Sequence, residues 1–188
     1  MIKEYFETLF DLLKNTIVTN SSGTRILFSD GINEVISLIE AKSKYNKLIF
    51  IGNGGSAAIA SHEAIDFLKN GKIRTLCFNE ASLLTCMSND YGYENVFSYP
   101  IELLADEGDI LVAISSSGES QNILNAVKVA KEKGCMVITF SGFRDNNILK
   151  HLGDFNFYVS SFEYGFVELS HQIILHMILD FILEKRRV

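Results

Sequence analysis

The chain has 188 residues, a hydrophobic fraction of 47% and a formal net charge of −6. This length is most simply one domain, and it is long enough to bury a full core. The negative charge disfavours nonspecific binding to nucleic acid or to an anionic membrane surface, so we expect neither as a partner.

Helical spacing of apolar residues predicts two N-terminal helices, at 2–18 and 25–42, separated by Ser21-Ser22-Gly23. From residue 46 onward, short apolar runs alternate with stretches of helical spacing. This alternation predicts an α/β fold with a doubly wound parallel sheet flanked by helices. We expect one domain, with a helical segment at 1–45 and an α/β core at 46–188. The predicted strands are 48–51, 73–78, 110–114, 136–140 and 155–159, and the predicted core helices are 56–69, 80–88, 93–104 and 120–133.

The C-terminal stretch 166–183 is apolar enough to raise the question of a membrane span. Its polar and ionisable residues would be costly in lipid, so we predict a helix buried inside a protein or an oligomer. These residues are Glu168, His171, Gln172, His176 and Asp180.

The cysteines and the N-terminus bear on the compartment. Cys77, Cys86 and Cys135 are odd in number and widely spaced, which fits neither a disulfide framework nor a paired metal site. We interpret all three as buried thiols. The first residues are partly acidic and lack the apolar core of a secretory signal, so we expect a cytoplasmic protein.

Two loops rich in small residues carry the main functional signal. Gly52-Asn-Gly-Gly-Ser56 follows the first predicted core strand, and Ser115-Ser-Ser-Gly-Glu-Ser120 follows the third. Each precedes a predicted helix, whose N-terminus presents free N–H groups that bind phosphate. Because both loops follow parallel strands, we expect them to face the same crevice and to hold a phosphorylated ligand.

The first loop also allows a nucleotide-binding interpretation. Gly52, Gly54 and Ala57 fit the pattern G-x-G-x-x-A, and Glu80 stands where a ribose-binding acid is found. The second loop disfavours this alternative, because a dinucleotide fold needs only one phosphate turn. We therefore expect no nucleotide cofactor.

Several motifs together resemble the sugar isomerase (SIS) domain family, and within it the phosphoheptose isomerases. The motifs are the two loops, Asn89-Asp90-Tyr91-Gly92 and His171-Gln-Ile-Ile-Leu-His176. The resemblance implies a flavodoxin-like three-layer sandwich and a homotetramer with sites between subunits. It also implies aldose–ketose isomerisation of sedoheptulose 7-phosphate to D-glycero-D-manno-heptose 7-phosphate through an enediol.

The resemblance assigns Asp66 as the catalytic base and His176 as the group that shuttles protons. Asp66 is a departure, because the isomerases have glutamate there, and His62 shares its helix face at i, i+4. The implied phosphate and sugar contacts come from both loops, the Asn-Asp pair and the last helix. They are Asn53, Gly54, Gly55, Ser56, Asn89, Asp90, Ser115, Ser116, Ser117, Ser120 and Glu168. Asp90 has a second interpretation, as a cap of the turn before Gly92.

The family's zinc-containing members imply a metal site at His62, Asp66, Glu168 and His176, whose side chains are suitable zinc ligands. Glu168 and His176 are eight residues apart, roughly 12 Å along one helix, so either a side chain stretches or subunits share the site. Without metal, Glu168 would instead bind sugar hydroxyls or relay a proton. His171 lies about 140° round the helix axis from His176, which favours a packing or interface role.

Two further departures from the pattern of the family leave the identity of the sugar open. The family generally has aspartate at Ile59 and arginine near the stretch 68–72, which here reads Leu-Lys-Asn-Gly-Lys. A second function also remains open, a noncatalytic SIS module that binds a sugar phosphate or a protein partner, as the replication-initiation factor of this family does. The shorter Asp66 favours the module, whereas His62 and His176 favour the enzyme.

Overall fold

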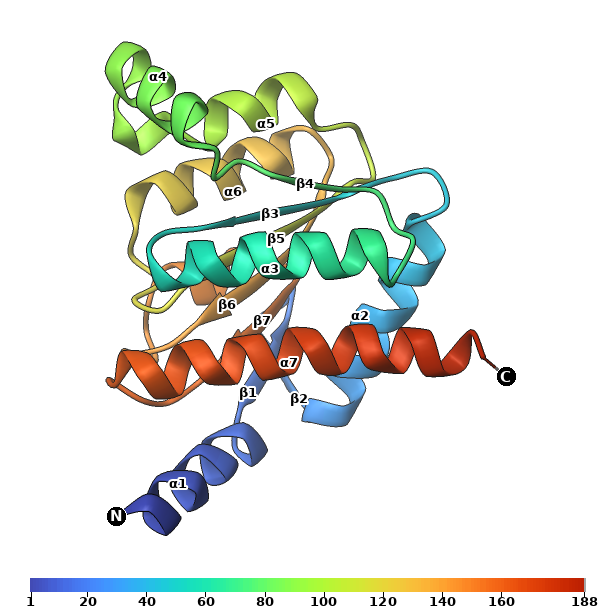
Figure 1. Ribbon diagram of the computed structural model, residues 1–188, viewed down its shortest axis with the longest axis vertical. Helices are drawn as coiled ribbons and strands as arrows, with labels where there is room; N and C mark the ends of the chain where they lie inside the picture. The colour runs from blue at the N-terminus through green and yellow to red at the C-terminus, as the bar shows by residue number, and fades with distance from the viewer. Residues whose placement is uncertain (188) are drawn as a thin grey trace.

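One seven-stranded sheet runs through residues 1–187, the part of the chain that the computed structural model describes (Figure 1). Its order is β2-β1-β7-β6-β5-β3-β4, and the five strands from β7 to β4 are parallel. Across the sheet these five parallel strands lie in the order β4-β3-β5-β6-β7, so the first two in the chain are exchanged, which is the flavodoxin-like arrangement. The predicted fold class is therefore confirmed. The parallel strands are β3 (Leu48–Gly52), β4 (Thr75–Cys77), β5 (Ile110–Ser115), β6 (Met136–Ser141) and β7 (Phe155–Tyr158).

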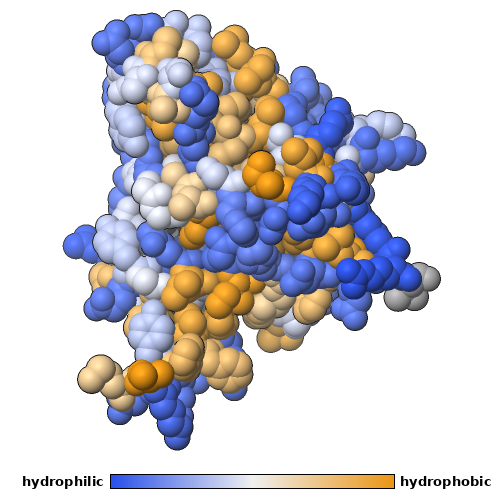
Figure 2. All heavy atoms as spheres, viewed as in Figure 1, coloured by the Kyte–Doolittle hydropathy of each residue, from blue (hydrophilic) through white to orange (hydrophobic). Residues whose placement is uncertain are grey.

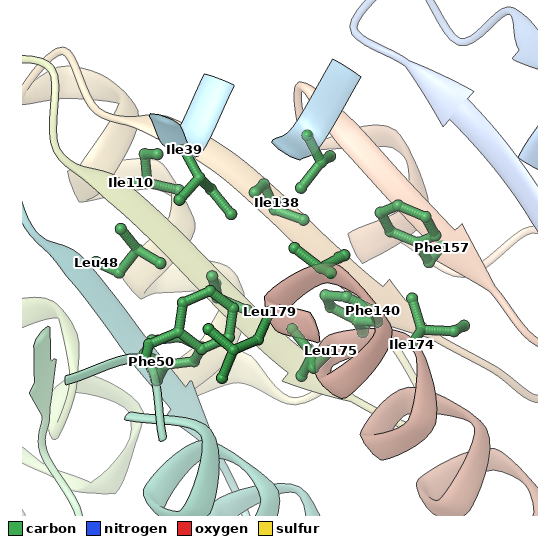
Figure 3. Close-up of a cluster of buried hydrophobic side chains, with 14 of the residues drawn as sticks. Ile39, Leu48, Phe50, Ile110, Ile138, Phe140, Phe157, Ile174, Leu175 and Leu179 are labelled. Atoms are coloured by element: carbon green, nitrogen blue, oxygen red, sulfur yellow. The ribbon is translucent and has the colours of Figure 1, made fainter. Parts of the chain in front are cut away.

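Helices cover both faces of the sheet. One face carries α2 (Phe28–Lys42), α3 (Gly55–Lys69) and α7 (Tyr164–Lys185), and the other carries α4 (Ala81–Tyr91), α5 (Ser98–Leu104) and α6 (Gln121–Glu132). Side chains alternate along each strand, so Phe50 packs under α3 and α7 (Figure 3). Ile51, the next residue, packs in the cluster on the opposite face, with α5 and α6. Burial on both faces explains why β3 and β5 are almost continuously apolar.

The prediction of two N-terminal helices, at 2–18 and 25–42, was wrong for the end of the first helix and the start of the second. The first helix, α1 (Ile2–Lys14), ends early, and a hairpin of β1 (Ile17–Asn20) and β2 (Arg25–Ile26) follows. β1 pairs antiparallel with β7, so the complete sheet is mixed. Ile17, Val18 and Thr19 are β-branched and fit a strand, and Val18 is only 1% exposed there.

The predicted helix 93–104 is interrupted. A short 3₁₀ turn, η1 (Tyr93–Asn95), precedes α5, and Val96 and Phe97 are buried between the two. A second 3₁₀ turn, η2 (Leu149–His151), was not predicted. Leu149 of η2, like Val96 and Phe97 after η1, is buried in the cluster on the face that α6 covers.

Helix α7 has the length and apolar composition of a membrane span, yet it lies across the sheet beside α2 and α3 (Figure 1). Eight of its residues are buried, which fits the predicted core helix. His171 is among them. Its Nε2 donates to the carbonyl oxygen of Ser141 at 3.1 Å, and burial lowers its pKa to about 4, so the ring is neutral. The packing role predicted for His171 is confirmed.

The prediction that all three thiols are buried was wrong for Cys86. Cys135 is buried and Cys77 is half-buried, but Cys86 is exposed on α4, a helix with no fully buried residue. The apolar residues of α4 are only partly covered by the core beneath it, so its outer face remains in solvent.

We expect Gly52→Ala to destabilise the protein, because a Cβ there would lie 2.5 Å from the backbone carbonyl of Ser56. Overpacking of this kind costs about 1–3 kcal/mol. Gly165→Ala is the control, since the nearest atom to its added Cβ is 3.7 Å away. Denaturant unfolding should show a loss for the first variant alone, and equal stability of the two would contradict this packing.

Candidate active site

The two glycine- and serine-rich loops line one cavity of about 250 Å³ at the carboxyl ends of β3 and β5. This is the point where the strand order reverses, as the sequence predicts. Nine predicted ligand contacts line this cavity. They are Asn53, Gly54, Gly55, Ser56, Ser115, Ser116, Ser117, Ser120 and Glu168.

Glycines allow both loops to turn sharply into their helices. Gly54 has a φ of +55° directly before α3, and Gly118 has a φ of +66° before α6. In the second loop, the Gly118 N–H donates to the Ser115 carbonyl at 3.0 Å. The first turns of α3 and α6 therefore flank the cavity, where their free N–H groups favour an anion.

The serines of the second loop have different local roles. Ser115 Oγ donates to Ser120 Oγ at 3.4 Å, and Ser117 Oγ accepts from the Glu119 N–H at 3.2 Å. Ser116 Oγ is buried and has no hydrogen-bond partner within residues 1–187. Its hydroxyl is therefore available to a ligand in the cavity.

Asn53 is held by a network that sequence reasoning missed. Its amide exchanges two hydrogen bonds of 2.9 Å with the amide of Asn122, and its Oδ1 also accepts from the Tyr93 hydroxyl at 2.9 Å. These partners lie on α6 and η1, so two elements fix the orientation of one cavity residue.

Helix α7 contributes Tyr164 and Glu168 to the cavity, and Tyr164 was not predicted. Its position four residues before Glu168, on the same helix face, is a signal that could have found it. The Glu168 carboxylate lies against Gly55, at the place where any side chain of residue 55 would stand. The glycine is therefore required for α7 to bring this carboxylate to the cavity.

A second cluster lies farther along the contact between α3 and α7. Asp66 Oδ2 is 3.4 Å from His62 Nε2 and 3.8 Å from His176 Nδ1. The two imidazole rings meet edge to face, with centroids 5.1 Å apart. The structure thus brings together His62, Asp66 and His176, from two helices about 110 residues apart in the chain.

Glu63 belongs to the same cluster and was missed. It is 0% exposed, accepts a hydrogen bond from Gln172 Nε2, and has its Oε1 3.4 Å from His176 Nε2. Burial, followed by the negative charges of Asp66 and Asp180, raises the pKa of Glu63 to about 8. The sequence does carry a signal for the burial of Glu63, because this residue lies four positions after Ile59 on the buried stripe of α3.

This cluster can hold a metal ion. Nitrogen and oxygen atoms of His62, Glu63 and His176 all lie within 4.8 Å of one another, and such donors suit zinc. Glu168 lines the cavity with the serines and is not in this group. Its assignment as a ligand stays a prediction.

The Asn89-Asp90 pair lies on α4, outside the cavity. Asn89 borders a separate shallow hollow with Ser88 and Tyr93, and donates to Asp90 Oδ1 at 2.8 Å. A contact of this pair with sugar hydroxyls therefore stays a prediction. Gly92 ends the helix with a φ of +83°.

Comparison with known proteins places the chain in a family. The model of the SIS domain matches residues 4–142, most of the chain. The chain belongs to the SIS domain family. It is 36% identical over 151 residues to a phosphoheptose isomerase of Pelobacter propionicus, covering 77% of this chain and 79% of that protein.

Two further relatives extend this comparison of the SIS domain. A probable phosphoheptose isomerase of Thermoplasma acidophilum is 37% identical over 173 residues, covering 87% of this chain and 94% of that protein. The structure of a phosphoheptose isomerase from Neisseria gonorrhoeae superposes with a TM-score of 0.83 at 27% identity, covering 96% of both chains.

Two residues that raised questions in the sequence have structural roles in this SIS domain. Glu80 caps α4, since its carboxylate accepts from the Leu83 N–H at 2.9 Å. Ile59 is 6% exposed and packs in the core beneath α3, so an apolar residue suits this position.

We expect Ser116→Ala to weaken binding of inorganic phosphate by roughly ten- to a hundredfold. A hydrogen bond to a charged group contributes about 1.5–3 kcal/mol, and this hydroxyl has no competing partner. Calorimetric titration with phosphate measures the loss. Ser170→Ala is the matched control, because Ser170 Oγ is also buried and unpartnered within residues 1–187 but lies outside the cavity. Equal affinities of the two variants would contradict the assignment.

Proposed function

We propose that this SIS domain is an aldose–ketose isomerase of a phosphosugar, with sedoheptulose 7-phosphate and D-glycero-D-manno-heptose 7-phosphate as its substrate pair. One observation supports the proposal: the cavity lined by the glycine- and serine-rich loops and the imidazole–carboxylate cluster both lie along the contact between α3 and α7. The names of the curated relatives support the choice of sugar.

The proposed chemistry needs one base and one proton shuttle. Asp66 takes the proton from the carbon beside the carbonyl, and the electron pair of that bond forms the enediol double bond. The same carboxyl returns the proton to the neighbouring carbon. His176, 3.8 Å from Asp66, moves the hydroxyl proton between the two oxygens, so that one carbonyl replaces the other.

The cavity residues hold and orient the substrate in this proposal. The serines of the second loop and the first-turn N–H groups bind the phosphate, whereas Asn53 and Glu168 contact the sugar chain. We retain Asn89 and Asp90 as contacts of the sugar hydroxyls. Holding both ends of the sugar phosphate places its reacting carbons beside Asp66.

We propose zinc as the metal of the His and carboxylate cluster, and no nucleotide cofactor. The candidate ligands from the sequence are His62, Asp66, Glu168 and His176, and two imidazoles with carboxylates match its preference. A bound zinc ion acts as a Lewis acid that polarises a carbonyl oxygen.

We propose a homo-oligomer, a tetramer, in which copies of α1 cover one another. No residue of α1 is buried, and its large apolar residues Ile2, Phe6 and Phe10 are 60–78% exposed on this amphipathic helix. Figure 2 shows apolar atoms gathered below α7, toward α1. An exposed apolar surface of this kind typically marks an interface.

We propose the cytoplasm as the compartment. Cys77, Cys86 and Cys135 are all free, and the exposed Cys86 thiol would persist most readily in a reducing environment.

Phe6→Glu combined with Phe10→Glu is expected to reduce the oligomer to a smaller species, because charges would replace apolar side chains of α1. Light scattering coupled to size-exclusion chromatography measures the mass. Asp11→Lys, on the same exposed helix, is the control. An unchanged mass of the double variant would contradict an interface at α1.

Incubation with sedoheptulose 7-phosphate in deuterated water tests the enzymatic proposal by NMR. We expect deuterium at the reacting carbon together with aldose, and a loss of at least about a hundredfold in Asp66→Asn and His176→Ala. Binding of the sugar phosphate without exchange in the folded, zinc-supplemented protein would reject the isomerase. It would favour the noncatalytic module.

A further inference from the structure

Glu63 is a carboxyl group buried in the contact between α3 and α7. It is 0% exposed, and within residues 1–187 no lysine or arginine forms an ion pair with it. Its charged neighbours Asp66 and Asp180 carry the same sign. A carboxylate in this position is costly unless a proton or a cation compensates its charge.

The hydrogen bonds of Glu63 leave half of the carboxylate unused. Gln172 on α7 donates to Oε1, but Oε2 has no partner within the described residues although it is inaccessible to solvent. Buried polar atoms are nearly always satisfied, so an unpaired carboxylate oxygen points to a ligand.

The surroundings of Glu63 have the geometry of a metal centre. Its Oε1 is 3.4 Å from His176 Nε2, close to the separation of about 3.3 Å between two ligands at about 2 Å from a tetrahedral zinc ion. His62 completes the group within 4.8 Å. Its side chain is 55% exposed, which leaves a path for an ion to enter. The amide of Gln172 supplies the outer hydrogen bond that orients a carboxylate ligand.

We propose that Glu63 is a metal ligand, together with His62 and His176, and that Asp66 is not needed for coordination. The ligand set predicted from the family used Asp66 both as ligand and as base. With Glu63 in the ligand position, Asp66 keeps its lone pairs for the carbon-bound proton. The role of Asp66 rests on the proposed function, but coordination by Glu63 does not.

The first test is calorimetric titration of the intact protein with Zn²⁺, comparing wild type, Glu63→Gln and Asp66→Asn. Both variants exchange a carboxylate for an amide on the same helix, three residues apart. We expect Glu63→Gln to weaken zinc binding about a hundredfold or more, and Asp66→Asn to weaken it at least tenfold less. Equal losses, a larger loss in Asp66→Asn, or no zinc binding by the wild type would overturn the proposal.

The melting temperature separates a lost ligand from a damaged fold. Metal-free Glu63→Gln is expected to melt at or above the wild type, because an amide of nearly the same shape cannot ionise in this buried position. Zinc should raise the melting temperature of the wild type more than that of the variant. An equal zinc-induced rise in both proteins would count against Glu63 as a ligand.

A direct spectroscopic test uses Co²⁺ with Glu63→Cys and Asp66→Cys. A cysteine thiolate bound to Co²⁺ gives charge-transfer absorption in the near ultraviolet, so the band reports which position coordinates. The wild type with its three native thiols is the blank. We expect the band for Glu63→Cys alone. A band for Asp66→Cys alone, or for neither variant, would contradict the proposal.

Deuterium exchange measured on the same samples keeps the two proposals apart. Exchange by a wild type that binds no zinc would reject the metal ligand and retain the isomerase. Loss of zinc affinity in Glu63→Gln, in a protein that exchanges no sugar proton, would retain the ligand and reject the isomerase.

Discussion

The close approach of α7 to the layer formed by α3 and the loop ends is the constraint on which the site depends. Glycines permit it at separate points along the helix. A Cβ on Gly142 would lie 2.7 Å from Val167, one on Gly71 would lie 3.1 Å from Leu179, and Gly55 leaves room for Glu168. Because these contacts lie near both ends of α7, they fix its direction as well as its distance. His176 is thereby held beside Asp66.

The same helix stabilises the fold through its buried apolar side chains. Ile174, Leu175, Ile178 and Leu179 are at most 2% exposed, and burial of such a side chain contributes about 1.5–3 kcal/mol. Unpartnered buried groups at Glu63 and Ser116 act in the opposite direction, each costing about 1–3 kcal/mol or more. The apolar residues of α7 therefore help to offset groups on α3 and in the loop after β5 that are unsatisfied until a ligand binds.

Local signals predicted the core and both loops, because a strand buried on both faces must be apolar and a tight strand-to-helix turn must use glycine. Signals that depend on distant partners were missed. The ends of the two predicted N-terminal helices, at 17–18 and 25–26, form strands instead, because β1 pairs with β7, about 140 residues later. Spacing from Ile59 places Glu63 on the buried stripe of α3, but its hydrogen bond with Gln172, 109 residues away, needed the structure. His62 and Asp66 share a face by spacing alone, whereas their contact with His176 needed the family resemblance or the structure.

Two carboxylates three residues apart on one helix have different surroundings here, and that difference separates their roles. Asp66 has a side chain 24% exposed between two imidazoles, so a substrate can reach it and its charged form remains solvated. Glu63 is closed off by α7 and can meet only a partner that has lost its own water. A proton acceptor for a carbon acid needs the first environment, and an ion held by buried side chains fits the second. The shorter side chain of Asp66 is compatible with this division, because its carboxylate lies between His62 and His176.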